Sequence, residues 1–384
     1  MRLPATVIVL GTVSLLNDVA SDMIAPLLPV FLLTVLGAGP AAVGMIEGVA
    51  ETTSSLLKLY AGHLADRGVG LRRLALGGYS LSNLVRPLIG LASTWPMVLA
   101  LRFGDRVGKG LRTAPRDALL AQAVNADVRG RAFGLHRAMD HMGAMIGPVL
   151  AAALLATGLD MRTVFLVSVV PGTLAVGLLA VGVKEVRRPR AQPPPLRWSA
   201  LPRPLQGLIV AASGLAFAAI PDAFLVLWLS ASGIGVAAIP ALWAVAHGLR
   251  AVVAFPAGQL SDRVGRLPVM LAGWLARAAV LTLMPWFSTA PTVIGLFLIY
   301  SALTAATEGA ERALIGDVAE EAVRGTAFGA YHMLVGLLAL PGALWFGAVW
   351  EGIDMATAFM LSAALTLSAA LWFAWRVRGL QRRG

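Results

Sequence analysis

The chain has 384 residues, of which 58% are hydrophobic and only 13% are charged. Soluble domains carry about 25% charged residues, so this composition excludes an ordinary soluble enzyme and indicates an integral membrane protein. The chain has no cysteine, which excludes disulfides and thiolate metal sites. Its five histidines form no zinc-binding spacing such as His-Glu-x-x-His. We therefore expect no metal site and no cofactor.

The formal net charge of +11 is compatible with nucleic-acid binding, but the basic residues lie in short segments between apolar runs. These segments alternate along the chain with loops that together contain a single Arg. The positive-inside rule then predicts that both termini and the central loop are cytoplasmic, which requires an even number of spanning helices. We expect a multi-pass protein of the inner (plasma) membrane with no nucleic-acid partner.

A spanning helix needs about 20 predominantly apolar residues, and the length of the chain accommodates about twelve such helices with short loops. The first apolar stretch is too long for the core of a signal peptide and lacks a small-residue cleavage site, so it is predicted to be the first helix. In chain order, the helices are predicted at 7–35, 41–63, 74–92, 96–115, 131–157, 163–183, 206–229, 237–259, 268–287, 292–314, 327–350 and 357–376.

The stretch from Lys184 to Pro204 interrupts this rhythm with five Arg and six Pro residues. That composition is typical of a stiff, polar connector without a packed core. The sequence thus predicts an all-α integral membrane protein with 12 transmembrane helices in two pseudo-symmetric six-helix bundles. The N-terminal bundle covers 1–183, a basic Pro-rich cytoplasmic linker covers 184–205, and the C-terminal bundle covers 206–384.

The two halves repeat. Four short segments recur at offsets of 194 to 196 residues. Arg129–Gly134 corresponds to Arg324–Gly329, and the Asp-Met-x-Thr-x-Phe pattern at 160–165 returns at 354–359. Two parallel six-helix repeats are typical of transporters that rock about a site near the middle of the bilayer.

Three motifs carry a resemblance to a known family. Gly258–Arg266 closely follows the pattern Gly-x-Leu-Ala-Asp-Arg-x-Gly-Arg-Arg, and Gly62–Arg73 keeps its Gly, Leu, Asp and Arg. Arg102–Gly110 is similar to Arg-Phe-x-x-Gly-x-Gly, and Gly143–Pro148 matches the first half of an exporter motif that ends in two glycines. On these motifs the whole chain resembles the major facilitator superfamily, which implies secondary transport by alternating access.

Ionisable side chains inside the bilayer are functional candidates, because a charge near its centre costs at least about 2.5 to 3.5 kcal/mol. A carboxylate that alternately meets and leaves an Arg can load and release a proton. The predicted proton-coupling residues are Asp18, Asp22, Glu51, Asp105 and Asp140. The predicted substrate-binding residues are Asn83, Arg86, Arg102, Arg106, His247 and Arg277, whose arginines suit carboxylate or phosphate oxygens.

Each group has a structural alternative. The arginines and acids near the middle of the bilayer can form ion pairs that only stabilise the fold. Lys109, Arg112 and Arg116 are placed near the cytoplasmic end of helix four, where they can extend to the lipid headgroups. The loop residues Asp66, Arg67, Asp262 and Arg263 are predicted to latch helix ends and to act in gating.

The sequence therefore predicts a proton-coupled secondary transporter of an anionic or metal-chelating small molecule. Its expected partners are the substrate, protons and the lipid bilayer, and it is expected to act as a monomer. Proton-coupled multidrug efflux of lipophilic compounds is the alternative, favoured by the half-matched exporter motif. A non-transporting receptor is less favoured, and no nucleophile with its base is visible that would make the chain an enzyme.

Overall fold

The computed structural model describes residues 4–66, 69–124, 129–184, 198–318 and 324–381, and all regular secondary structure in these ranges is helical. Within them, nine helical segments are long and apolar enough to cross a membrane. Helices α3 (Pro40–Asp66) and α5 (Trp95–Gln122) are not among the nine, and both carry several charged residues. Helix α4 (Leu71–Val85) is also outside the set and has only 15 residues.

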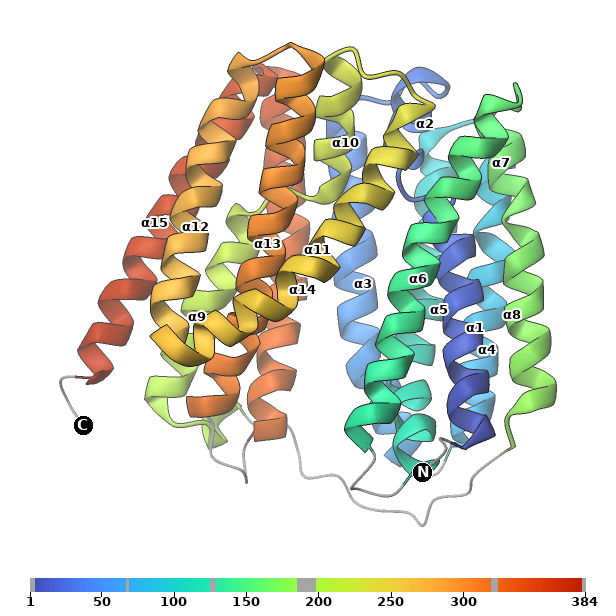
Figure 1. Cartoon of the computed structure of the whole chain (residues 1–384), viewed down its shortest axis with the longest axis horizontal. Coiled ribbons are helices and arrows are strands. Elements are labelled where there is room, and N and C mark those ends of the chain that lie inside the picture. Colours follow the sequence, from blue (N-terminus) through green and yellow to red (C-terminus); the bar gives the residue numbers. More distant parts are fainter. Residues whose placement is uncertain (1–3, 67–68, 125–128, 185–197, 319–323, 382–384) are drawn as a thin grey trace. The chain divides into compact units, whose positions relative to one another are not determined.

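The chain forms two compact units, each described here by itself. The first comprises Met1–Ala38, Val49–Pro194 and Gly235–Ala244. In this unit α1 packs against α6 and α8, and α4 packs against α5 and α8 (Figure 1). Besides α4, α5 and most of α3, its helices are α1 (Ala5–Asp22), α2 (Leu28–Thr34), η1 (Pro87–Leu91), α6 (Arg129–Ala156), α7 (Met161–Val167) and α8 (Val169–Gly182).

Glycines let the helices of the first unit approach closely. A Cβ added at Gly143 or Gly147 of α6 would meet the carbonyl oxygens of Leu15 and Val19 on α1. Gly78 of α4 and Gly108 of α5 likewise face each other's backbone. Small residues at such spacings are the usual means of close helix packing in membranes. The exporter-like motif in α6 therefore has a packing role here.

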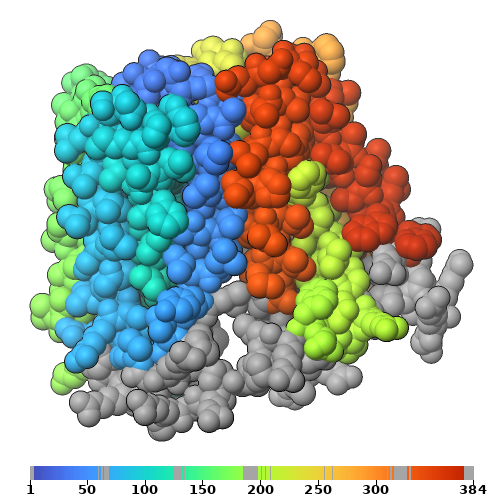
Figure 2. All heavy atoms as spheres, turned by 180° about the vertical axis from the view of Figure 1, so that it is seen from behind, coloured from blue at the N-terminus to red at the C-terminus, as the bar shows by residue number. Residues whose placement is uncertain are grey.

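The second unit comprises Gly39–Gly48, Pro195–Ile234 and Val245–Gly384. Helix α12 packs against α13 and α15, and α9 packs against α14 and α15. Its core includes the buried ring of Trp274, which meets Phe373 edge to face at 5.0 Å between centroids. The helices are η3 (Trp198–Ala200), α9 (Arg203–Ala218), α10 (Asp222–Ala231), the larger part of α11 (Ala238–Val264), α12 (Arg266–Leu283), η4 (Met284–Trp286), α13 (Ala290–Val318), α14 (Arg324–Gly352) and α15 (Met355–Gln381). In the space-filling view, side chains fill the gaps seen between ribbons within each unit (Figure 2).

Several predicted helices are interrupted at prolines. The segment 7–35 is divided between α1 and α2 near Pro26, and 206–229 is divided between α9 and α10 next to Pro221. Proline lacks the backbone N–H and its ring clashes with the preceding turn, which explains both breaks. The predicted end of helix four at 115 is wrong, because α5 continues through Pro115 to Gln122. Membrane helices tolerate such prolines where neighbouring groups satisfy the freed carbonyl.

The repeated Asp-Met-x-Thr pattern is a pair of helix N-caps. The Asp160 carboxylate accepts a hydrogen bond from the Thr163 backbone N–H at 2.9 Å, at the start of α7. At the start of α15, the Asp354 carboxylate accepts a hydrogen bond from the Thr357 backbone N–H at 2.7 Å. It also accepts a hydrogen bond from the Thr357 hydroxyl. The hydrogen bonds from Thr163 and Thr357 lower the pKa of these two exposed carboxyl groups. The repeat therefore marks two equivalent helix starts.

Candidate functional site

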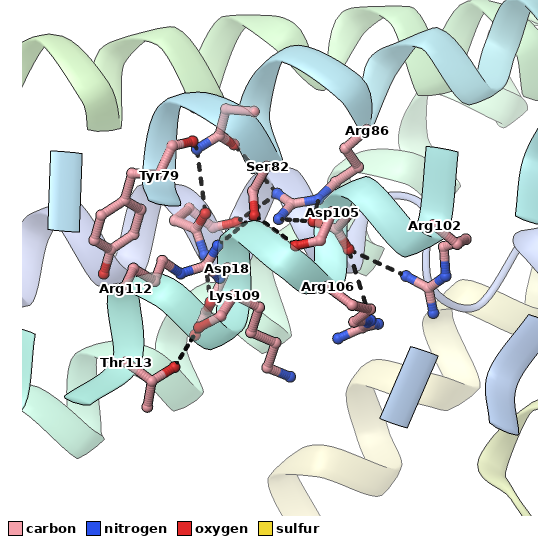
Figure 3. Close-up of polar contacts among 12 residues, drawn as sticks. Asp18, Tyr79, Ser82, Arg86, Arg102, Asp105, Arg106, Lys109, Arg112 and Thr113 are labelled. Carbon is pink, nitrogen blue, oxygen red and sulfur yellow. Dashed lines mark hydrogen bonds and ion pairs between the residues drawn. The ribbon is translucent and has the colours of Figure 1, made fainter. Parts of the chain in front are cut away.

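Asp105 is the centre of a buried cluster between α4 and α5. Its Oδ1 accepts hydrogen bonds from Nε and Nη2 of Arg86 at 3.2 and 2.9 Å. On the other side, Arg102 Nη1 and Arg106 Nε lie 3.6 and 3.7 Å from Oδ2 (Figure 3). Three guanidinium groups of charge +1 around one carboxylate of charge −1 leave a local excess of +2. This arrangement favours a further anion.

Asn83 and Asn17 hold Arg86 in place. Arg86 Nη1 donates to Asn83 Oδ1 at 3.2 Å and to the Asn17 backbone oxygen at 3.4 Å. The Asn83 amide in turn donates to Asn17 Oδ1 at 3.3 Å and to the Tyr79 backbone oxygen at 3.0 Å. Asn83 was predicted to contact substrate, but its described contacts give it a positioning role. The network joins α1, α4 and α5 around one arginine.

The charged residues of α5 form a stripe. At 100° per residue, Arg102, Asp105, Arg106, Lys109, Arg112 and Arg116 fall within about 120° of the helix circumference. Arg112 is only 5% exposed, donates to Ser82 Oγ at 2.8 Å and lies over the Tyr79 ring at 4.7 Å. Arg116 donates to Ser14 Oγ at 3.3 Å. Extension to the headgroups is therefore wrong for Arg112 and Arg116, since α5 continues past them and packs them inward.

Glu51 and Asp22 face the same stripe. The Glu51 carboxylate on α3 accepts a hydrogen bond from Ser55 Oγ at 3.3 Å and interacts electrostatically with Lys109, Lys58 and Arg106. The Asp22 carboxylate, at the end of α1, interacts with Lys109 and Arg86. Both acids thus partly compensate the charge of α5. They belong with the Asp105 cluster rather than apart from it.

Asp18 and Asp140 form a second group with different neighbours. Asp140 Oδ2 on α6 lies 3.6 Å from His136 Nδ1 and 3.5 Å from Arg137 Nη1. Asp18 on α1 accepts a hydrogen bond from Asn17 Nδ2 at 3.0 Å and experiences electrostatic repulsion from Asp140. The five predicted proton-coupling residues therefore divide into an arginine-rich cluster and a histidine-containing one. His136 was not among the predicted site residues, although its spacing of four from Asp140 was a readable signal.

In the second unit, Arg277 is 7% exposed and donates to the Tyr300 hydroxyl at 3.1 Å, with its guanidinium over the Tyr300 ring. Asp222 accepts two hydrogen bonds from Arg250, both at 3.2 Å, and interacts electrostatically with His247 and Arg277. The predicted residues His247 and Arg277 thus both interact electrostatically with one carboxylate, whose hydrogen-bond partner is Arg250. Tyr300 could not be singled out in advance, because a lone tyrosine in an apolar helix carries no functional pattern.

Glu311 of α13 is a further partly buried acid that the predicted site did not include. Its Oε1 accepts a hydrogen bond from Trp274 Nε1 at 2.8 Å, and Oε2 lies 3.5 Å from the Tyr331 hydroxyl. Glu311 also interacts electrostatically with Arg277. Its position near the predicted end of helix ten made it look peripheral, whereas α13 extends to Val318.

The predicted gating residues are only partly described. Arg67 lies outside the described residues, as do the side chains of Asp66 and Asp262 at the ends of α3 and α11. Arg263 lies exposed in the last turn of α11. A gating role for these four residues stays a prediction.

Comparison with known proteins places this architecture in a family. The family model of the Major Facilitator Superfamily matches residues 10–249. An uncharacterised MFS-type transporter of Methanocaldococcus jannaschii is 29% identical over 379 residues, covering 96% of this chain and 94% of that protein. An uncharacterised protein of Mycobacterium tuberculosis is 30% identical, covering 97% and 93%. A bacterial homolog of the human lysosomal transporter Spinster, in an inward-facing and occupied conformation, has a similar fold, with a TM-score of 0.82 at 16% identity over 97% and 96% of the two chains.

Proposed function

Because this chain belongs to the major facilitator superfamily and is a multi-pass membrane protein, we propose that it is a proton-coupled secondary transporter of an anionic small molecule. It works by alternating access between two six-helix bundles, 1–183 and 206–384, joined by a cytoplasmic linker at 184–205. Its twelve helices span the inner membrane with both termini in the cytoplasm, and one chain is the working unit. A free organic anion and an anionic metal chelate are the two forms of substrate that this charge suits.

The observation that carries the proposal is the convergence of Arg86, Arg102 and Arg106 on the single carboxylate of Asp105. Arginine stays protonated in proteins and presents a planar set of donors that matches carboxylate or phosphate oxygens. Arg86 is committed to Asp105 by two short hydrogen bonds, whereas Arg102 and Arg106 meet it at ion-pair distances beyond hydrogen bonding. A substrate anion binds at Arg102 and Arg106 while Asp105 holds Arg86.

Proton coupling follows from the other acids of the unit. An anion that enters an already charged site changes the electrostatic potential at the nearby carboxylates, and a proton that binds there offsets the added negative charge. Asp22 and Glu51 interact with arginines and lysines around Asp105, whereas Asp18 interacts with Arg112 and Arg116. Asp140 is paired with Arg137 of its own helix. In the second unit, Arg277 and His247, which interact electrostatically with Asp222, are the proposed substrate contacts.

The proposal can be tested with the purified full chain. Thermal unfolding is measured in detergent with lactate, benzoate, phosphate and ferric citrate, and with tetraphenylphosphonium as a lipophilic cation. A ligand that binds the folded state raises the unfolding temperature, and the stabilisation grows with the logarithm of its concentration relative to Kd. The protein is then placed in vesicles that contain a pH-sensitive dye. We expect an anion both to stabilise the protein and to move protons, and stabilisation by the cation alone would contradict the proposal.

Multidrug efflux is the second candidate, favoured by the exporter-like motif of α6. Gly143 and Gly147 let α6 pack directly against the backbone of α1. The matched half of the motif is therefore explained by helix packing alone. If tetraphenylphosphonium moves protons and no anion does, efflux replaces anion transport as the function. If ligands stabilise the protein but neither class moves protons or crosses the membrane, the chain acts as a receptor.

A further inference from the structure

We infer that His136, Asp140 and Asp18 form one proton-binding site that is distinct from the Asp105 anion site. The inference rests on the proposed function and deepens it, because it assigns the coupling proton to three of the many ionisable groups in the first unit. The site lies where α6 packs on α1, and its members come from both helices.

His136 and Asp140 are one helical turn apart on α6 and meet inside the protein. Their side chains are 4% and 10% exposed, and Nδ1 of the imidazole lies 3.6 Å from Oδ2 of the carboxylate. The remaining polar atoms, His136 Nε2 and Asp140 Oδ1, are buried and have no hydrogen-bond partner among the described residues. Such buried unsatisfied atoms are costly and uncommon in native proteins. If His136 and Asp140 bind and release a proton, His136 Nε2 and Asp140 Oδ1 are atoms that can carry it, which accounts for their lack of a hydrogen-bond partner among the described residues.

Asp18 reaches this pair because the two helices are in close contact. A Cβ added at Gly143 would lie 3.0 Å from Cβ of Asp18, so α6 has no side chain between its own backbone and the acid. Asp18 is half-buried and is electrostatically repelled by Asp140. Two carboxylates that interact in a poorly solvated site can share one bound proton, which removes the repulsion between them.

The Asp105 cluster differs from this site because its charges are permanent. Its three arginines keep a permanent positive charge and cannot hand over a proton at physiological pH, so Asp105 stays ionised. At the second site the partner is a histidine, which unlike arginine has a neutral form and can release its proton. One cluster therefore fixes charge and the other exchanges it.

Arg112 and Arg116 of α5 connect the two sites. Both interact electrostatically with Asp18, and Arg116 also interacts with His136 and Asp140. A proton taken up at His136 and Asp140 thus changes the charge opposite the α5 stripe that continues to Arg106 and Arg102. The charged and titratable groups that face the site are Asp18 and Asp22 of α1, Arg112, Arg116 and Asp117 of α5, and Arg137 of α6.

The test uses infrared difference spectra of the full chain in phosphatidylcholine vesicles, recorded without ligand between about pH 8 and about pH 5. We expect the wild-type protein to show a protonated carboxyl band that grows as pH falls. The band is lost or strongly reduced in Asp140→Asn or Asp18→Asn. His136→Gln shifts the midpoint of the band by at least about one pH unit, because the residue beside Asp140 no longer carries an ionisable ring.

Two matched controls lie close by in the chain. His141→Gln removes an exposed histidine of the same helix, and Asp160→Asn replaces an exposed carboxyl by another good N-cap. Neither is expected to change the band. If Asp140→Asn does not reconstitute, the midpoint of His136→Gln alone decides. A band of unchanged size and midpoint in the variants of His136 and Asp18 overturns the inference.

Failure of the inference and failure of the proposed function give different results. If lactate, benzoate, phosphate and ferric citrate neither bind nor move protons in the wild-type vesicles, the proposed function fails, whatever the spectra show. If one of these anions moves protons in the wild type and equally well in His136→Gln and Asp140→Asn, the function stands and the proton site is wrong.

Discussion

Arg86, the residue directly after α4, and Asp105 of α5 are joined by two hydrogen bonds to the same oxygen, and both side chains are at most 3% exposed. Removal of one partner leaves the other charge buried and uncompensated, which typically costs about 3 to 5 kcal/mol. We therefore expect Arg86→Gln to lower the unfolding temperature of the purified protein strongly.

The double variant Arg86→Gln with Asp105→Asn tests the cause of that loss. Because it removes both charges, it should be more stable than the sum of the two single changes predicts, by roughly 0.5 to 3 kcal/mol in a double-mutant cycle. Additive losses would show that the two residues do not form a coupled pair in the membrane protein.

Arg102→Gln and Arg106→Gln should each weaken binding of the stabilising anion by about ten- to a hundredfold, as expected for loss of a charge-assisted hydrogen bond. The measurement is the ligand-dependent rise in unfolding temperature at several concentrations. Arg73→Gln is the matched control, since Arg73 is an exposed arginine near the start of α4. Equal weakening in all three variants would mean that overall charge, and not this cluster, attracts the anion.

Much of this site was accessible from the sequence because intramembrane charge is rare. The spacing of Arg102, Asp105 and Arg106 alone indicated a common helix face, and the structure confirms that face. The pairing of Arg86 with Asp105 could not be predicted in the same way, because it depends on the register between two helices. That register is set by the mutual backbone contact of Gly78 and Gly108, a non-local feature.

The errors in the predicted helices have a local cause. Pro26 and Pro221 lie at breaks, whereas Pro115 lies within a continuous helix, and the residue type is the same in each case. What differs is whether surrounding groups compensate for the missing hydrogen bond, which tertiary packing decides. The early end assigned to helix four also misplaced Arg112 and Arg116 at the membrane surface.

The contact between α1 and α6 gives a prediction on packing. Gly147→Val should destabilise the protein by about 1 to 3 kcal/mol or more, because the new side chain meets the Val19 oxygen and the Met23 nitrogen. Gly177→Ala is the control, since an added Cβ in α8 meets nothing within 4 Å. It should be neutral or stabilising by up to about 1 kcal/mol. Similar unfolding temperatures for the two variants would contradict the close packing of α6 against α1.

The last prediction concerns the N-cap of α15. The backbone N–H and hydroxyl of Thr357 donate to Asp354 and lower its pKa below the ordinary value of about 3.9. A group whose pKa is lower in the folded state stabilises that state above its unfolded pKa, and this contribution disappears as pH falls through the folded pKa.

Asp354→Ala should therefore lower the unfolding temperature at neutral pH, whereas Asp354→Asn, which keeps an N-cap acceptor, should lower it less. The difference between wild type and Asp354→Asn should shrink as pH falls below about 4, because the carboxyl is protonated first in the unfolded state and at still lower pH in the folded state. Unfolding scans at a series of pH values measure both differences, and a gap between wild type and Asp354→Asn that does not change with pH would show that the charge of Asp354 has no part in capping.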